Sequence, residues 1–397
     1  MANDSPAASQ VMTAWASWCD QLKASGRRLV DEDFPPSDRD VAEGFRNLGR
    51  LAVLGWLRNV EFNDAAFPAF LRVMDDVTQW GGPNPDNTYL RAVVHGDHEY
   101  RIVGNVGKLH DMIVSLHEGE FPLESIKLWG ELRLSELAVD SSGDFEILIS
   151  RRQPERDAPW LEVPAGAAWV NIRMYHYDWP ADSPGWVRID RLGGEGDVPE
   201  VITTDRLARQ LAAAAALADD SLVYWKDFFH QRQRDARPNE LSPPGSPPGG
   251  AHALAYGSGF WDLGPDEMLL IELQHPKASY WSLCAYDNER MQVPDWLWRQ
   301  TSFNGAQAHE DDDGIIRIVV AHTDPGVPNW LDTTGYRTGW LSDRYIDVEE
   351  LPRRTTRLLT AEQLRAALPA SHPRFDAVMR NDQRARRQQA MARRFRH

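Results

Sequence analysis

The sequence predicts a mainly β fold of the α+β class, with two antiparallel β-sandwich or jelly-roll-like lobes, an N-terminal helical block, a linking helix and a C-terminal helix. Apolar residues recur at helical spacing in the first part of the chain and then alternate with a period of two over many short segments. The 397 residues exceed the roughly 250 at which single hydrophobic cores stop growing. More than one domain is therefore expected.

The N-terminal helical block is predicted to cover residues 1–82. Apolar side chains at helical spacing predict three helices, around residues 11–22, 41–54 and 70–77. Ser37 precedes Asp40 by three residues, which resembles a capping box with a shorter acid and places the start of the second helix there. The block ends at Gly81-Gly82-Pro83.

A first β domain is predicted over residues 83–202. The HGDH segment at 95–98 is typical of a hairpin loop between the first two strands, and a Gly-rich loop follows at 193–196. Period-two alternation predicts five strands, at 89–94, 99–104, 112–116, 145–150 and 167–177.

Residues 203–250 are predicted to hold the linking helix, from Thr204 to about Arg234, and a Pro/Gly loop at 238–250. So many prolines and glycines exclude a helix or a central strand. The loop is therefore expected at the surface, as an ordered lid or a flexible linker.

The C-terminal β domain is predicted over residues 251–359, with strands at 267–275, 279–287, 315–322 and 337–346 and a hairpin turn at DDDG, 311–314. No internal repeat of fixed period is visible in the sequence. A basic helix is predicted at 360–397. From Arg374 onward this segment contains eight arginines and only two aspartates. It is expected to dock on the acidic body or on a second subunit, rather than to bind a free anion.

The order of segments in the C-terminal domain resembles a known family. The strand YWSLCAYD is followed by an Asp-Gly turn before IIRIVVAH, and then by PNWLDTTGYRTGWLSDRYI. These marks are similar to those of the family of domains of unknown function 1214. NPDNTYLRA, at 84–92, resembles the upstream motif of these proteins, often part of the companion domain 1254. The resemblance implies a jelly-roll-like β fold and supplies no catalytic residues.

One departure from the family pattern affects the possible chemistry. Many members continue the Asn-Trp-Leu step with a Pro-Ala-Pro-like turn, whereas here Asp332-Thr333-Thr334 follows. A carboxylate and two hydroxyl groups therefore stand where other members are apolar.

Composition narrows the possible partners. A formal net charge of -16 disfavours nucleic acid and anionic membranes, because both would repel the body of the protein. The two cysteines have no metal-binding spacing, and HExxH, GxSxG, Walker and GxGxxG motifs are absent from the sequence, so no metal and no cofactor are expected. The first residues lack a basic leader, and no apolar stretch reaches a membrane span of roughly 20 residues. We expect a cytoplasmic homo-oligomer that acts on a small molecule.

The first candidate constellation lies in NPDNTYLRA. Strand alternation places Asn87, Tyr89 and Arg91 on one face, and Asp86 adds a general acid or base. In the alternative interpretation, the Asn and Asp side chains of this turn cap their own backbone.

The second constellation is NIRMYHYDW, at 171–179. Arg173, Tyr175 and Tyr177 would share one face, and His176 and Asp178 the other, where the carboxylate could orient the imidazole as a general base. The alternative is a sandwich face with buried aromatic side chains and solvated polar ones.

The third constellation belongs to the C-terminal domain, where Trp281 and other tryptophans could line a ligand pocket. An amide beside a Trp can orient a bound ring, and Arg344 could bind a carboxylate or pair with Asp287. Alternatively, these residues only maintain the fold. The members are Tyr286, Asp287, Asn329, Trp330, Asp332, Arg344 and Tyr345. HEDDDG, at 309–314, is also a weak calcium candidate, for which a plain turn is the favoured alternative.

The function expected from these groups is that of a metal-independent acid/base enzyme, a hydrolase or lyase acting on a small hydroxylated or ring-containing molecule such as a sugar, terpenoid or phenolic. The alternatives are a non-catalytic protein that binds a carbohydrate or lipid-like ligand, and an interaction scaffold. The predicted catalytic residues are Asp86, Tyr89, His176, Asp178 and Asp287. The predicted substrate-binding residues are Asn87, Arg91, Tyr175, Tyr177, Trp281, Tyr286, Asn329, Trp330, Arg344 and Tyr345.

Overall fold

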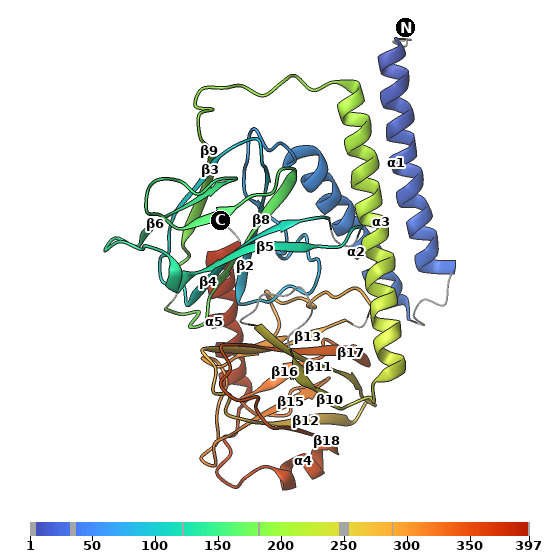
Figure 1. Cartoon of the computed structure of the whole chain (residues 1–397). Helices are drawn as coiled ribbons and strands as arrows, with labels where there is room; N and C mark the ends of the chain where they lie inside the picture. The colour runs from blue at the N-terminus through green and yellow to red at the C-terminus, as the bar shows by residue number, and fades with distance from the viewer. Residues whose placement is uncertain are drawn as a thin grey trace. The chain divides into compact units, whose positions relative to one another are not determined.

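The computed structural model describes residues 5–31, 37–120, 123–181, 183–245, 254–287 and 289–395 (Figure 1). The chain divides into two compact units. Unit 1 comprises Met1–Trp80, Thr88–Met174 and Gly185–Lys226, and unit 2 comprises Gly81–Asn87, Tyr175–Pro184 and Asp227–His397. Short pieces of the early chain therefore belong to the C-terminal unit.

The N-terminal helices are α1, Pro6–Asp31, and α2, Asp38–Trp56, which continues as a π-helical turn over Leu57–Glu61. The predicted cap of α2 is confirmed, because the Ser37 hydroxyl accepts a hydrogen bond from the Asp40 backbone N–H at 3.2 Å. The helix α3, Thr204–Asp235, confirms the predicted linking helix.

The third N-terminal helix predicted at residues 70–77 is wrong. The segment forms the short strand β1, Leu71–Arg72, followed by bends. The Asp75 carboxylate accepts hydrogen bonds from the backbone N–H groups of Val77 and Thr78, at 2.8 and 2.9 Å. This local turn competes with helical hydrogen bonding, so apolar spacing alone was misleading.

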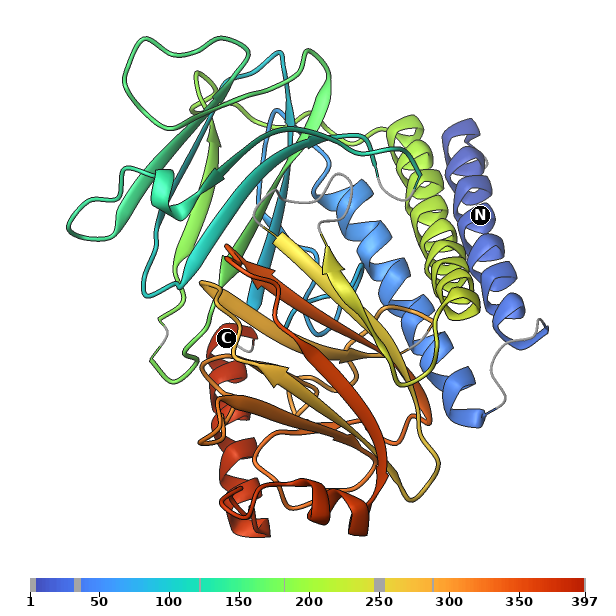
Figure 2. The ribbon, with the colours of Figure 1, turned by 60° about the horizontal axis from the view of Figure 1, so that its bottom comes forward.

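Within unit 1, α1 lies alongside α3 (Figures 1 and 2). Polar contacts join the two helices along their length: Gln10 donates to Asp205 at 2.5 Å, and the Ser25 hydroxyl donates to Asp219 at 2.5 Å. Apolar side chains of α1, α2 and α3 form one buried cluster with Leu29, Leu48, Leu51, Ala218 and Leu222. The helical block is thus held by burial as well as by hydrogen bonds.

Two sheets form the sandwich of unit 1, with orders β1-β2-β8-β4-β5 and β7-β6-β3-β9 among the described residues. Their inner faces meet in a core that includes Val114, Ile147 and Ile172. The remaining strands are β2 Asn87–His95, β3 Tyr100–Asn105, β4 Asp111–Glu118, β5 Lys127–Arg133, β6 Asp144–Ser150, β7 Trp160–Glu162, β8 Ala167–Tyr175 and β9 Trp186–Arg191. A 3₁₀ turn follows β5 at Leu134–Glu136.

The predicted hairpin at HGDH is wrong. The strand β2 lies in one sheet and β3 in the other, where β3 pairs with β6 and β9. The Gly96 N–H donates to the Gly166 carbonyl at 3.1 Å, and a Cβ at Gly96 would approach the Pro164 carbonyl to 2.1 Å. The glycine therefore permits a close crossing between the sheets.

Unit 2 has a second sandwich, with sheet orders β10-β11-β17-β13-β14 and β16-β15-β12-β18 over the described residues. Its core includes Trp261, Leu283 and Ile318. The strands are β10 Leu241–Gly245, β11 Leu254–Asp262, β12 Glu267–Gln274, β13 Tyr280–Tyr286, β14 Ser302–Asn304, β15 Ile315–Ala321, β16 Trp330–Asp332, β17 Thr338–Ile346 and β18 Arg354–Thr360.

The two sandwiches have the same topology. Numbered from the first strand of each unit, both have the orders 1-2-8-4-5 and 7-6-3-9 within the described residues. The match includes the parallel pairs, which are β6 with β7 and β15 with β16. The chain therefore contains a duplication at the level of the fold that no fixed sequence period revealed.

The Pro/Gly loop predicted at 238–250 is partly a strand. β10 forms the edge of its sheet beside β11, a position that tolerates proline because one side of an edge strand needs no N–H donor. Residues 246–253 lie outside the described part of the chain, so the choice between lid and linker stays open.

The basic C-terminal segment contains α4, Ala361–Ala367, and α5, Ala377–Phe395. Arg380, Arg387 and Arg394 are seven residues apart on α5, and all three are buried. Each donates to backbone carbonyl groups of unit 2, those of Val327, Trp296 and Pro85 among them. The tail thus docks within its own unit, which is one of the two docking surfaces expected from the sequence; a contact with a second subunit stays a prediction.

Candidate functional site

A turn from the early chain lies against the first sheet of unit 2. Within it, the Asn84 side chain accepts from the Asp86 N–H at 3.1 Å, and the Asn87 N–H donates to the Asn84 carbonyl at 2.9 Å. Three of its carbonyl groups accept hydrogen bonds from unit 2 side chains: Arg344 to Gly82 at 2.9 Å, Tyr286 to Pro83 at 2.8 Å and Arg394 to Pro85 at 3.0 Å. The self-capping turn is confirmed, and it also presents Asp86 to the sheet.

Asp86 is 1% exposed and accepts three hydrogen bonds from neutral groups. The Tyr280 hydroxyl donates at 2.5 Å, the Trp179 indole N–H at 2.8 Å and the Asn304 amide at 2.8 Å. Because every donor is neutral, the carboxylate has no direct ion pair among them, which is an unusual arrangement for a buried Asp.

Burial raises the pKa of Asp86 above its ordinary value, although the bonds from Tyr280, Asn304 and Trp179 and the charge of Arg394 oppose the rise. Burial and the nearby Asp86 also raise the pKa of Tyr280 well above 10.0. Tyr280 is therefore a neutral hydrogen-bond donor at physiological pH.

Trp179 connects this buried cluster to a cavity. The guanidinium carbons of Arg387 and Arg394 lie 4.8 and 4.6 Å from its ring centre, and Arg393 donates to its carbonyl at 2.9 Å. The indole N–H donates to Asp86, and two guanidinium groups lie near the ring. Together these contacts fix the rotamer of Trp179.

The cavity beside Trp179 has a volume of about 430 Å³. It combines aromatic, amide and charged side chains, the composition expected where a small molecule is oriented by a few polar contacts. The Oε1 atom of Gln307 is buried there without a hydrogen-bond partner. The lining residues are Tyr177, Asp178, Trp179, Pro180, Gln300, Ala306, Gln307, Phe375, Met379, Asp382, Gln383, Arg386 and Arg387.

Tyr177 belongs to both the buried cluster and the cavity. Its ring centre lies 5.3 Å from that of Tyr280, and the Tyr175 ring lies 5.2 Å from Tyr280 on an edge-to-face contact. Burial and the Asp86 charge raise the pKa of Tyr177 to about 12, so its phenol is neutral. A Cβ at Gly305 would come within 1.9 Å of the Tyr177 hydroxyl, so a glycine is required there. Of the predicted substrate-binding residues, Tyr177 lines the cavity and Tyr175 supports it.

The predicted His176–Asp178 pair does not form. β8 ends at Tyr175, so strand alternation does not continue through Asp178. His176 is 0% exposed and its backbone N–H donates to the Asp86 carbonyl at 2.8 Å, whereas Asp178 is exposed. The two side chains therefore lie in different environments, and His176 is placed as a core residue.

Asp287 pairs with a residue that the sequence did not single out. The Arg290 Nε atom donates to its carboxylate at 3.2 Å, and both side chains are buried. The Arg344 guanidinium carbon lies 5.6 Å from the ring centre of Tyr286. The predicted Arg344–Asp287 pair is thus replaced by a local ion pair three residues apart, which the closing turn after β13 brings together.

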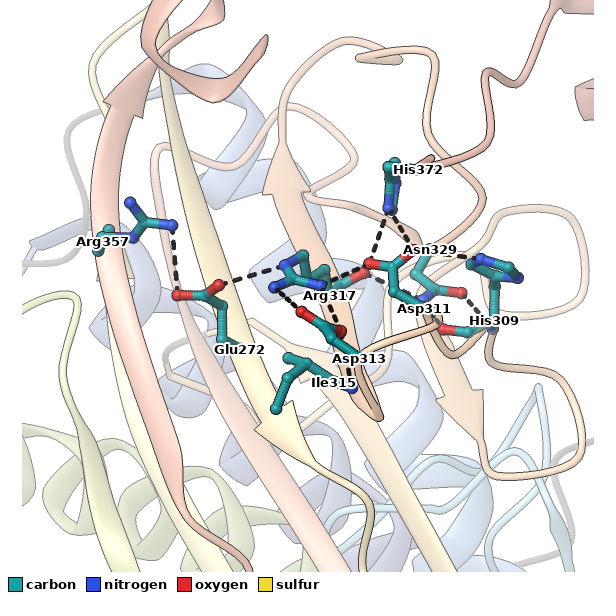
Figure 3. Close-up of polar contacts among 9 residues, drawn as sticks. All are labelled: Glu272, His309, Asp311, Asp313, Ile315, Arg317, Asn329, Arg357 and His372. Atoms are coloured by element: carbon teal, nitrogen blue, oxygen red, sulfur yellow. Dashed lines mark hydrogen bonds and ion pairs between the residues drawn. The ribbon is translucent and has the colours of Figure 1, made fainter. Parts of the chain in front are cut away.

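Four residues of the third constellation maintain the fold. The Trp330 indole donates to the Ala321 carbonyl at 3.0 Å, and the Tyr345 hydroxyl donates to Asp343 at 2.5 Å. Asn329 accepts from the His309 N–H at 2.8 Å and donates to its carbonyl at 2.7 Å (Figure 3). Trp281 belongs to the buried core of the unit 2 sandwich.

Figure 3 also shows why the HEDDDG segment is a turn and not a calcium loop. The Arg317 guanidinium donates to Asp311 at 2.7 Å and to Asp313 at 2.7 Å, so it occupies the carboxylates that a cation would need. His372 contacts Asp311 at 2.8 Å. The turn does not close a hairpin, because β14 before it and β15 after it belong to different sheets.

Two residues of the first constellation lie in unit 1. β2 has the predicted alternation, but Tyr89 packs in an apolar cluster with Leu54 and Leu71. Arg91 is buried and donates to Glu120 at 2.6 Å. Asn87, at the start of the strand, belongs to unit 2 and is buried. The three residues predicted to bind one ligand therefore have different roles. Tyr89 packs in the core, Arg91 forms an ion pair and Asn87 follows the turn.

The sequence analysis missed Trp179, Asn304, Gln307 and Arg387. Trp179 stood at the end of the NIRMYHYDW motif, so its position was a usable signal. Asn304 ends the three-residue strand β14 and Gln307 follows it, and Arg387 was one of many arginines in the basic tail. Their roles depend on contacts between distant segments, which local patterns do not encode.

Comparison with known proteins gives one family match. Residues 266–341 match the family model described as a protein of unknown function, DUF1214. These residues belong to the DUF1214 family. The DUF1214 region contains Tyr280 and Asn304, two of the three donors to Asp86. The resemblance of residues 84–92 to the companion domain stays a prediction.

The fold of the chain is similar to that of a solved structure. A crystal structure of an uncharacterised protein from Burkholderia cenocepacia is 27% identical, with a TM-score of 0.82, and the match covers 90% of this chain and 99% of that one. The VPA0106 protein from Vibrio parahaemolyticus is 12% identical over 79% of this chain and 96% of that one, but a TM-score of 0.44 is too low to support an argument. No curated protein matches the chain. None of the helices in the described residues is long and apolar enough to span a membrane.

Proposed function

We propose that unit 2 binds a small, ring-containing, hydroxylated molecule in the cavity lined by Trp179. The observation that carries this proposal is the buried Gln307 Oε1 atom, which lines the cavity without a hydrogen-bond partner. A buried acceptor left unpaired is costly, and a ligand hydroxyl would satisfy it.

The other lining groups support the same ligand class. Tyr177 and Trp179 give the lining its aromatic part, and Gln300 and Gln383 add amide groups to it. A sugar, a phenolic or a terpenoid alcohol combines a ring with hydroxyl groups. The cavity volume of about 430 Å³ suits a molecule of that size.

In this proposal Asp86 is a positioning residue. It does not line the cavity and instead fixes the Trp179 indole through a 2.8 Å hydrogen bond. The role assigned to it from the sequence, that of a general acid or base, needs direct contact with the reacting group. Asp86 therefore supports binding from behind the cavity wall.

The test is a thermal-shift screen of the purified full chain against sugars, uronic acids, phenolics and terpenoid alcohols, followed by calorimetric titration of each hit. Gln307→Leu is expected to weaken binding about 10-fold, because it removes the unpaired acceptor. Gln389→Leu, an exposed position on α5 outside the cavity, serves as the matched control. Equal affinity in the wild type and in Gln307→Leu would refute the proposal.

Hydrolase or lyase activity at the same cavity is the second candidate function. It is favoured by two carboxylates, Asp178 and Asp382, which both line the cavity and could act as acid and base. Asp178→Asn and Asp382→Asn would then abolish turnover of a hit ligand while binding persists. Binding without turnover in the wild type would leave a non-catalytic binding protein.

We propose a cytoplasmic homo-oligomer without a resident metal or cofactor, as the sequence predicts from its charge and motifs. Cell fractionation and light scattering after size-exclusion chromatography test location and oligomeric state. A monomer at physiological concentration would contradict the oligomer.

A further inference from the structure

A second cavity, of about 1000 Å³, lies entirely within unit 1. Three segments line this open cavity: the loop at residues 63–67, the Gly-rich loop after β9 and the beginning of α3. The polar residues that matter for its chemistry are Asp64, Arg191, Glu200, Arg206, Arg209 and Gln210.

One face of α3 forms the cavity wall. Arg206, Arg209, Gln210 and Ala213 are spaced three, four and seven residues from the first, which places them on a single helical stripe. They belong to the first turns of a 32-residue helix, whose N-terminal end favours negative charge. Two guanidinium groups thus face the cavity at the positive end of a helix dipole.

The Gly-rich loop is shaped around Arg191. Gly193 and Gly196 have φ values of 71° and 89°, which other residues rarely adopt. A Cβ at Gly194 would approach the Arg191 Nη2 atom to 2.2 Å, and Arg191 forms an ion pair with Asp197. The glycines therefore let the backbone close over the arginine and form one side of the cavity.

In the described part of the chain, Gln210 and Arg209 line the cavity without a partner for one of their polar groups. Gln210 is 8% exposed, and its Oε1 atom has no hydrogen-bond partner. Arg206 pairs with Asp64 at 2.9 Å, but Arg209 has no ion-pair partner among the residues that the structure describes. The cavity thus combines a buried acceptor with Arg209, an exposed guanidinium that no ion pair within the described residues holds, although Glu200 also lines it.

We infer that this cavity is a second binding site, specific for a small hydroxylated anion. Arg209 binds the anionic group, a phosphate or a carboxylate, and Gln210 accepts a hydrogen bond from a neighbouring hydroxyl. Neither an anion without hydroxyl groups nor a neutral sugar satisfies both side chains. The site is separate from the cavity proposed in unit 2.

The test is isothermal titration of the full chain with four probes: glucose 6-phosphate, gluconate, sulfate and glucose. Binding of glucose 6-phosphate or gluconate is expected, about 10-fold or more tighter than of sulfate or glucose. Preference between the first two identifies the anionic group as phosphate or carboxylate. Equal affinity for all four probes, or no binding of either hydroxylated anion, would overturn the inference.

Variants locate the binding. Arg209→Gln and Gln210→Leu should each weaken the preferred probe about 10- to 100-fold, since each removes one of the two contacts. Arg234→Gln on the distal part of α3 and Gln307→Leu in unit 2 should leave its affinity unchanged. Circular dichroism checks that each variant is folded. Full affinity in folded Arg209→Gln would contradict the site.

Discussion

The two sandwiches have the same strand order, yet the outer face of the corresponding sheet buries groups of opposite chemistry. In unit 1, the side chains of Ser115 and His117 on β4 point away from the core. Arg91 on β2 lies on the same outer face of this sheet. In unit 2 the equivalent strand β13 presents Tyr280, whose hydroxyl donates to Asp86. One copy holds a histidine between Ser115 and Trp169, near the charges of Arg173 and Arg91, and the other bonds a carboxylate to three neutral donors.

Burial drives both groups toward their neutral forms. The pKa of His117 is lowered to about 4, first by burial and then by the charges of Arg173 and Arg91. The pKa of Asp86 is raised, again chiefly by burial. A duplicated scaffold thus fixes where polar groups are buried, while the substituted side chains decide how stability depends on pH.

The largest expected effect is at Asp86. Asp86→Ala leaves the Trp179 and Asn304 donors and the Tyr280 hydroxyl unpaired in a buried site, so the free energy of unfolding should fall by about 3–5 kcal/mol. Asp86→Asn keeps an acceptor for Trp179 and Asn304 and should cost much less. Urea unfolding measures both variants. Equal loss in the two would mean that the charge, and not the hydrogen bonds, stabilises the cluster.

His117 gives the next effect, through pH. Its ring stacks on Trp169 at 4.5 Å, and in the unfolded chain its pKa returns to 6.5. The unfolded state binds the proton more tightly between pH 6.5 and 4, so the free energy of unfolding should fall by up to about 3 kcal/mol as pH decreases through this window. In His117→Phe this part of the pH dependence should disappear, whereas exposed His110→Gln should retain it. A slope unchanged in His117→Phe would contradict the assignment.

Asp86 should show the opposite sign. Because its folded pKa is raised above 3.8, the stability contributed by its neutral form is present below that pH and is lost as pH rises through the folded pKa. The stability advantage of the wild type over Asp86→Asn should therefore shrink as pH rises through the folded pKa. An advantage that grows with rising pH would show that Asp86 is stabilised as the anion.

A smaller effect is expected at Glu120, where two buried arginines share one carboxylate. Arg91 donates to it at 2.6 Å and Arg58 also pairs with it, and burial together with Arg91 lowers the pKa of Arg58 to about 9. Glu120→Gln removes the only negative charge of this trio, which should cost about 2 kcal/mol. Chemical denaturation with exposed Glu124→Gln as the control measures it. Equal stability of the two variants would show that the trio is solvated.

Strong local patterns predicted most of the fold. Period-two alternation located nine of the strands but missed β5, β9, β11 and β18. The Ser37 cap located α2. Both signals depend on neighbouring residues. The helix predicted at 70–77 was wrong because Asp75 forms a competing turn, and the HGDH hairpin was wrong because the chain crosses between sheets. The duplication was hidden because topology can persist after sequence periodicity has been lost.

The candidate site was predicted only in part. Asp86 and Tyr177 stood in recognisable motifs, whereas Trp179 gained its role from α5, more than 200 residues later in the chain. The expected His176–Asp178 pair failed because the strand ended one residue before His176. Sequence patterns indicate which face a side chain takes within an element, but not which distant segment will cover that face.

The most direct test of the unit 2 site is a crystal structure of the protein with the best hit from the screen. The proposal predicts electron density in the cavity beside Trp179 and Tyr177, with a ligand hydroxyl within hydrogen-bond distance of Gln307 Oε1. Well-defined ligand density elsewhere, with this cavity empty at saturating ligand, would contradict it.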